Sequence, residues 1–103
     1  MHHSGIRPVK SNELKALPDE RIIAAAREGE RRAFAELVRR YEDTVYRFAY
    51  SLCREREKAE ETFQDTFINV FRKLRTFDGR SKFSTWLYTI VTNSCLMRQL
   101  KQN

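Results

Sequence analysis

The sequence is short of the residues that build tight turns. Its 103 residues include three glycines and two prolines, and both prolines precede position 20. β-Sandwiches and β-barrels need many turns made from these residues, whereas helices tolerate their scarcity. The sequence therefore favours an all-α fold.

Residues typical of catalytic and metal centres are equally sparse. Cys53 and Cys95 lie far apart and outside any CxxC pattern, and the two histidines are His2 and His3. We expect both cysteines to be small, buried or half-buried thiols in a reducing compartment rather than a disulfide or zinc ligands. No nucleophile–base pairing, glycine-rich phosphate loop or HExxH spacing occurs, so we predict no enzyme, no catalytic residue, no metal site and no cofactor.

Long apolar runs are also missing. No run approaches the roughly 20 residues that a membrane span needs. The N-terminus, Met1-His2-His3-Ser4-Gly5, has no apolar core of a secretory signal. We expect one small cytoplasmic domain without membrane insertion.

The net charge of +6 is confined to one part of the chain. Residues 1–71 hold 13 basic and 13 acidic residues, whereas residues 72–103 hold seven basic residues and one acid, Asp78. A neutral body with a basic end indicates a surface that faces a polyanion. Surplus charge that merely keeps a small domain soluble is the alternative. The seven basic residues are Arg72, Lys73, Arg75, Arg80, Lys82, Arg98 and Lys101.

Apolar residues at three- and four-residue steps divide the chain into helices. Residues 1–17 show no such period and are expected to form a flexible leader. A first helix is predicted from Pro18 to about Gly29, and a long second helix from about Arg31 to Leu52. The charged segment 54–58 is predicted to be a turn.

Two further helices are predicted after that turn. The third has an apolar stripe formed by Ala59, Phe63, Phe67, Val70, Phe71 and Leu74. A turn at 77–81 follows, and Ser81 or Ser84 is expected to cap the last helix. Residues 18–103 are therefore predicted to form a compact antiparallel bundle of three to four helices.

Two surfaces of these helices bear polar groups that suit binding. On the third helix Glu60, Glu61, Gln64 and Asp65 share one face, which is either a solvated face or a docking face for a basic or helical partner. From Phe77 to Asn93, basic residues alternate with aromatic and hydroxyl side chains, as single-stranded nucleic acid requires. Phe83 and Trp86 fit a core role as well, and Tyr88 is the better candidate for exposure. A double-stranded-DNA reader fits this aromatic content less well.

Three motifs give the sequence a family resemblance. They are AEETFQDTF at 59–67, FRKL at 71–74 with Phe77, and FSTWLYTI at 83–90 with Asn93. Together they resemble region 2 of the sigma-70 family, in particular its extracytoplasmic-function (ECF) group, over about residues 19–101. The sequence departs from the family at Thr62, where an aliphatic residue is usual, and at Met97, where aspartate is frequent.

The resemblance implies a role for each surface. The chain would bind core RNA polymerase, at the β′ clamp helices, and would recognise and melt the promoter −10 element through its non-template single strand. A domain that binds the −35 element is expected in such factors and is not in this chain. A protein-interaction module targeted by an anti-sigma factor is the second interpretation. The polymerase-binding residues would be Glu61, Gln64, Asp65, Phe67, Asn69 and Arg72, and the DNA-binding residues Arg75, Arg80, Lys82, Phe83, Ser84, Thr85, Trp86, Tyr88 and Asn93.

Overall fold

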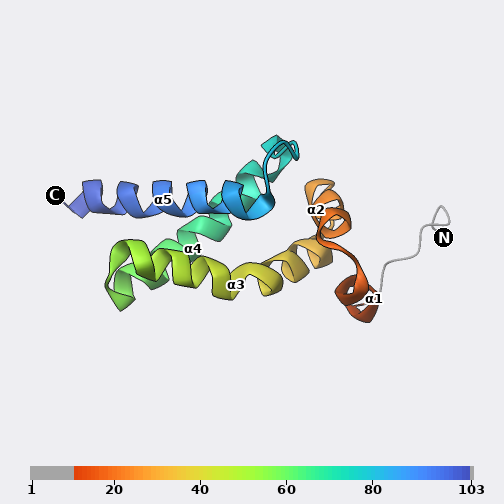
Figure 1. Ribbon diagram of the computed structural model, residues 1–103, viewed down its shortest axis with the longest axis horizontal. Helices are drawn as coiled ribbons and strands as arrows, with labels where there is room; N and C mark the ends of the chain where they lie inside the picture. The colour runs from red at the N-terminus through yellow and green to blue at the C-terminus, as the bar shows by residue number, and fades with distance from the viewer. Residues whose placement is uncertain (1–10, 103) are drawn as a thin grey trace. The chain divides into compact units, whose positions relative to one another are not determined.

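The computed structural model describes residues 11–102, and every regular element in this range is a helix (Figure 1). The described chain forms two compact units, one ending at Leu37 and the other beginning at Val38. The predicted all-α class is confirmed. Between residues 11 and 102 no helix is both long and apolar enough to span a membrane. The elements are α1 (Ser11–Ala16), α2 (Asp19–Arg27), α3 (Arg31–Cys53), α4 (Arg56–Lys73), the 3₁₀ helix η1 (Leu74–Thr76) and α5 (Phe83–Gln102).

The first unit contains α1, α2 and the start of α3. Residues 1–10 of the predicted leader lie outside the described residues, but Ser11–Ala16 is helical and Leu14 is buried, so the helices begin earlier than predicted. The end of α2 follows the prediction at Gly29. The Gly29 N–H donates to the Ala26 carbonyl and the next N–H, of Glu30, donates to the Ala25 carbonyl. This pair of hydrogen bonds at the end of a helix needs a positive φ at Gly29, and the φ of Gly29 is +96°.

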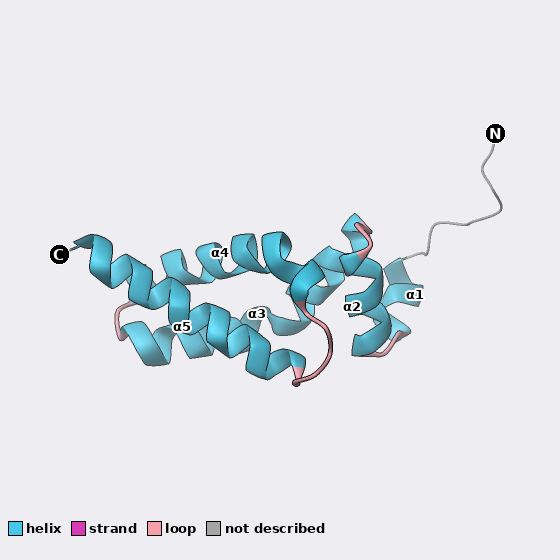
Figure 2. Cartoon of the chain, turned by 90° about the horizontal axis from the view of Figure 1, so that it is seen from above, coloured by secondary structure: helices cyan, strands magenta, loops and turns pink. Residues whose placement is uncertain are grey.

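The second unit is built from α3 beyond Leu37, α4 and α5, and successive helices run in opposite directions (Figures 1 and 2). Tyr46 of α3 contacts Phe63 of α4, and Phe48 of α3 contacts Tyr88 of α5. The antiparallel packing inferred from the short loops is therefore observed. Each fully buried aliphatic side chain stabilises such a core by about 1.5–3 kcal/mol. The largest in this unit are Val45, Val70, Leu87 and Val91.

The connection between α3 and α4 is shorter than predicted. Only Arg54 and Glu55 separate the two helices, because α4 begins at Arg56. Arg54 adopts a left-handed φ of 65°, and its N–H donates to the Tyr50 carbonyl at 2.8 Å. The first turn of α4 is charged and faces solvent, so it needs no apolar residue, which explains why periodicity missed it.

Two details of the predicted helices are wrong. Phe71 belongs to the predicted apolar stripe, yet it is 67% exposed. It follows the buried Val70 by one residue, which turns it about 100° away from the core. At the start of α5 the capping position before Phe83 is occupied by Lys82, whose carbonyl accepts from the Trp86 N–H, and not by Ser81 or Ser84.

Candidate nucleic-acid and protein interfaces

Basic side chains cluster where α4 gives way to α5. Arg72 and Lys73 end α4, Arg75 lies in η1, and two more cations, Arg80 and Lys82, lie in the following loop; all five are exposed. The loop is fastened locally, since Asp78 accepts from the Arg80 N–H at 3.0 Å and pairs with its guanidinium at 3.2 Å. These five residues form the basic rim. They are five of the seven basic residues in the C-terminal part of the chain, and all lie between positions 72 and 82.

An aromatic cluster joins the loop to the start of α5. The Phe83 ring meets Tyr41 at 5.2 Å and Phe77 at 5.3 Å, both edge to face, and Trp86 lies 5.5 Å away. Phe83 and Phe77 are buried, and Trp86 is half-buried. Such contacts stabilise packing beyond simple burial. Phe83, which the resemblance placed at a base pocket, therefore lies in the core and supports the loop from below.

The exposed face of α5 carries no charge over most of its length. Between Phe83 and Met97 the helix has no Asp, Glu, Lys or Arg. Tyr88 is 43% exposed, and its ring packs edge to face on Phe48 at 4.8 Å. Thr85 and Asn93 are also exposed, and Ser84 is half-buried. The expectation that Tyr88 is accessible is confirmed, and Phe48 fixes the angle of its ring.

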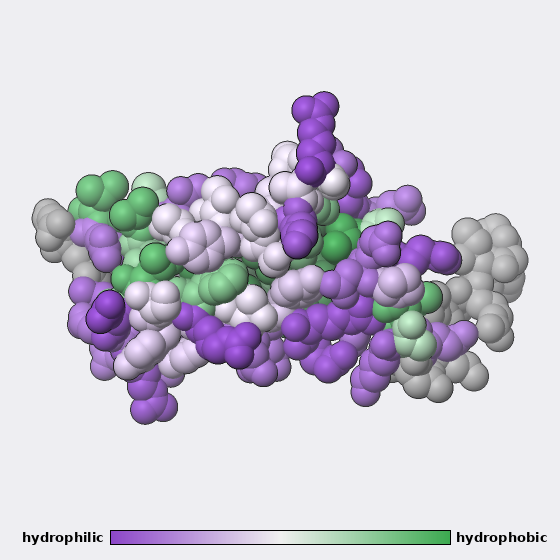
Figure 3. Space-filling view, in the orientation of Figure 1, coloured by the Kyte–Doolittle hydropathy of each residue, from purple (hydrophilic) through white to green (hydrophobic). Residues whose placement is uncertain are grey.

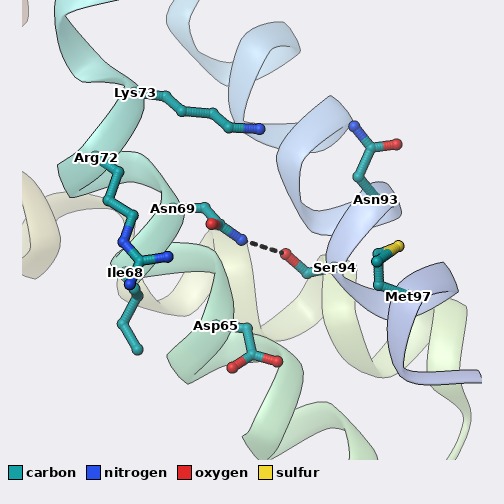
Figure 4. Close-up of a pocket in the computed structure, with 8 residues that line it drawn as sticks. All are labelled: Asp65, Ile68, Asn69, Arg72, Lys73, Asn93, Ser94 and Met97. Carbon is teal, nitrogen blue, oxygen red and sulfur yellow. Dashed lines mark hydrogen bonds between the residues drawn. The ribbon is translucent and has the colours of Figure 1, made fainter. Parts of the chain in front are cut away.

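A groove of about 700 Å³ runs between α4 and α5 (Figure 4). Asn69 donates from its amide to the Ser94 hydroxyl at 3.3 Å across the groove. Arg72 and Lys73 extend from α4 on one side, and Asn93 projects from α5 on the other. Asn69 and Arg72, which the resemblance placed on the polymerase face, thus line the same groove as the DNA candidate Asn93. The lining residues are Asp65, Ile68, Asn69, Arg72, Lys73, Asn93, Ser94 and Met97.

The acidic face of α4 is held by an arginine from α5. Arg98 Nε donates to Asp65 Oδ2 at 2.7 Å, and Arg98 Nη1 donates to Glu61 Oε1 at 3.1 Å. The bond to Asp65 raises the pKa of Arg98 above its ordinary value, against the opposing effect of burial. Arg98 therefore belongs with the α4 face and not with the basic rim, although the sequence placed it in the basic end.

Other residues of α4 change the predicted docking face. Gln64 is exposed as the docking hypothesis requires, but Phe67 is half-buried and meets Phe63 edge to face at 5.1 Å. Ile68 is 50% exposed and Phe71 is 67% exposed. The sequence analysis missed both as surface residues. The signal was available, because both lie far from Val70 around the helix.

Apolar side chains also gather over the last turns of α5, where Figure 3 shows green atoms near the C-terminal end of the helix. Leu96, Met97 and Leu100 are more than half exposed. Exposed apolar groups in sequence on one helix are typical of a protein contact rather than of a solvated end.

The two cysteines are free and buried. Cys53 Sγ lies 3.4 Å from the Thr62 hydroxyl, which gives this family departure a hydrogen-bond partner inside the core. Burial and the neighbouring Cys53 thiol raise the pKa of Cys95 to about 11. Among the residues whose placement is described, no group of three or more His, Cys, Asp or Glu could hold a metal ion.

These features coincide with a family match. Residues 37–103 match the family model described as sigma-70 region 2. The chain belongs to this family, and its relatives place it in the ECF group, as the resemblance indicated.

Particular relatives define the similarity further. The ECF RNA polymerase sigma factor SigW of Bacillus subtilis (strain 168) is 36% identical over 80 residues, which cover 78% of this chain and 43% of SigW. SigE of Mycolicibacterium smegmatis is 45% identical over 58 residues, covering 56% of this chain and 22% of SigE. The chain thus spans less than half the length of these relatives.

A solved structure shares the fold. It is the NMR structure of an engineered region 2 of sigmaE in complex with GTAAAA, with a TM-score of 0.77 and 31% identity. The match covers 84% of this chain and 90% of that one. The similarity therefore extends over most of the described helices.

Proposed function

We propose that this chain is the non-enzymatic module of a cytoplasmic sigma factor that binds core RNA polymerase and opens the promoter −10 element. The observation that carries the proposal is the uncharged, hydroxyl- and aromatic-bearing face of α5 beside the basic rim. Unpaired DNA needs both, because cations hold its phosphates while aromatic faces and hydroxyls contact its bases. The similar engineered sigmaE region was solved with the oligonucleotide GTAAAA, which supports this ligand class.

On the DNA side, Tyr88 is the proposed stacking platform. Stacking of one base on an aromatic ring contributes about 1–3 kcal/mol, which offsets much of the unstacking of that base from the duplex. We infer that Ser84, Thr85 and Asn93 contact base edges of the non-template strand. The exposed Arg75, Arg80 and Lys82 are the proposed phosphate contacts, and Trp86 and Phe83 would support the loop from the core.

On the protein side, α4 is the proposed dock for the β′ clamp helices. Glu61, Gln64 and Asp65 supply polar contacts, and the exposed Ile68 and Phe71 supply apolar ones. A desolvated aromatic anchor surrounded by polar contacts is the usual make-up of a binding hot spot. The arrangement of polar and apolar groups therefore favours a docking face for a helical partner over a face that only contacts solvent.

An anti-sigma factor is the second proposed partner. The exposed Leu96, Met97 and Leu100 favour a protein contact at the end of α5. If the module served only as such a target, the acidic face of α4 would still matter for binding and the basic rim would not.

The test is retention of the domain by bacterial core RNA polymerase. We expect wild type to be retained and a Gln64→Ala/Asp65→Ala variant to be lost. A Glu42→Ala/Asp43→Ala variant, which removes exposed acids from α3, is the control and should be retained like wild type. Failure of wild type to bind, or equal retention of both variants, would contradict the α4 dock.

A promoter-opening assay distinguishes DNA recognition from the interaction-module interpretation. A Lys82→Ala/Tyr88→Ala variant should bind polymerase normally and fail to melt a −10 element, as followed by permanganate reactivity of unpaired thymines. Unchanged melting would favour the interaction-module interpretation over DNA recognition.

A further inference from the structure

One arginine of α5 bridges two carboxylates of α4. Arg98 is placed 33 residues from Asp65 and 37 from Glu61 in the sequence, yet its forked guanidinium contacts both. We propose that Arg98 is a positioning residue for the polymerase dock, which holds Glu61 and Asp65 in one orientation before polymerase arrives. The inference rests on the proposed function of the α4 face.

The two acids need an external partner to lie together. Glu61 and Asp65 are four residues apart on one helix, so their charges repel each other. The helix dipole does not relieve this, because its effect fades after the first turn and α4 begins at Arg56. A guanidinium placed between them from the neighbouring helix removes the repulsion and fixes both side chains, since arginine binds carboxylates in a defined planar geometry.

The pairing leaves the acidic face able to bind. Two carboxylates and one guanidinium still sum to one negative charge, which attracts a basic partner. Arg98 engages Oε1 of Glu61 and Oδ2 of Asp65, whereas a carboxylate accepts up to about four hydrogen bonds. The side chains of Glu61 and Asp65 remain 50% and 34% exposed, so a partner can reach them.

Fixing these side chains in advance should strengthen docking. A free glutamate or aspartate loses rotamer freedom when a partner immobilises it, and that cost lowers affinity. In the folded domain Arg98 already restricts the rotamers of the Glu61 and Asp65 side chains. Loss of Arg98 should therefore weaken polymerase binding without removing any group that touches polymerase.

The experiment measures the Kd of the domain for core RNA polymerase. We expect Arg98→Ala to weaken binding roughly ten-fold, which matches the ordering of two side chains. Arg98→Lys should recover part of the loss, because it keeps the charge but lacks the planar fork. Arg47→Ala is the charge-matched control: it removes an exposed cation from α3, outside the proposed dock, so affinity should not change.

A double-mutant cycle separates positioning from a general loss of stability. If Arg98 acts through the two acids, Arg98→Ala should add nothing to the loss caused by Glu61→Ala/Asp65→Ala. Additive losses would overturn the proposal. Circular dichroism at the assay temperature gives the folded fraction of each variant, to which every Kd is corrected.

The remaining possible results also test the positioning role of Arg98. Tighter polymerase binding by Arg98→Ala would make Arg98 a mask, and unchanged binding would make the ion pair irrelevant to docking; either result overturns the positioning role. A loss confined to binding of single-stranded −10 DNA would make Arg98 a phosphate contact and would overturn it too. If wild type does not bind polymerase, the proposed function itself fails, which is a distinguishable result.

Discussion

The two helices that carry the proposed interfaces, α4 and α5, expose opposite chemistry. The outer face of α4 is charged, and two of its acids are held by an arginine from its neighbour. The outer face of α5 is uncharged from Phe83 to Met97, and the cations that serve it lie beyond its start, in the basic rim. A face for a structured protein partner benefits from fixed charges, whereas a face for unpaired bases benefits from flat rings and neutral hydrogen-bonding groups.

The strongest way to break this comparison is to remove the apolar anchor from α4. Phe71→Ala should lower polymerase affinity by about 2–4 kcal/mol, because a desolvated aromatic side chain often dominates an interface. Folding stability should change little, since the ring is 67% exposed. Isothermal titration with core RNA polymerase and thermal unfolding give the two quantities. Tyr50→Ala removes another exposed aromatic, from α3, and should leave affinity unchanged; equal losses would mean that α4 holds no special anchor.

The buried side of α5 should respond to pH in a way that its outer face does not. The pKa of Cys95 is raised to about 11 from 9.0, so above pH 9 the unfolded chain releases this proton before the folded chain does. The associated stability is present below pH 9 and is lost as pH rises from 9 to about 11. The loss is of the order of 3 kcal/mol, because the shift is about two pKa units at about 1.4 kcal/mol each.

Urea unfolding of wild type and Cys95→Ala across this range checks the prediction. Groups that titrate in both proteins, such as tyrosines and lysines, cancel in the difference. The stability gap between the two proteins should narrow as pH rises from 9 to 11. A gap that stays constant would show that the Cys95 thiol ionises alike in the folded and unfolded states.

The outer face of α5 is tested through Tyr88. Tyr88→Ala should weaken binding of single-stranded −10 DNA to the polymerase complex by about 1–3 kcal/mol, the contribution of one stacked base. Tyr88→Phe keeps the ring and should retain most of the affinity. Fluorescence anisotropy with a labelled oligonucleotide measures both. If Tyr88→Phe loses as much as Tyr88→Ala, the hydroxyl and not stacking supports the contact.

The fold followed from the sequence wherever periodicity was strong. The predicted second helix, from Arg31 to Leu52, ends one residue before the observed end of α3. Prediction from periodicity failed where a helix turn faces only solvent, as at the start of α4. It also failed where one residue lies just off the core stripe, as at Phe71. A stripe of apolar letters cannot tell a core phenylalanine from a neighbouring exposed one unless its angle around the helix is counted.

The sites were harder to predict than the fold because their residues meet across helices. Arg98 looked like one more cation of the basic end, and only the packing of α5 on α4 pairs it with Asp65. The same packing brings Asn69, a candidate for polymerase binding, into one groove with Asn93, a candidate for DNA binding. Such pairings depend on helix rotation and register, which local sequence does not specify.

The smallest expected effect concerns the basic rim. It tests whether the rim contacts phosphates while α5 contacts bases. Lys82 is exposed in the loop, whereas Arg80 is already paired with Asp78 at 3.2 Å. If Lys82 contacts one phosphate, Lys82→Ala should lower the magnitude of the slope of log K against log salt by about 0.7, the value for one contact with a single strand. Arg80→Ala should change the slope less, because Asp78 competes with the phosphate for the guanidinium. Anisotropy titrations over a range of potassium chloride concentrations yield both slopes. Tyr88→Ala should lower affinity at every salt concentration without changing the slope, because stacking releases no counterions; a changed slope would mean that the tyrosine orders the rim and that the two surfaces do not act separately.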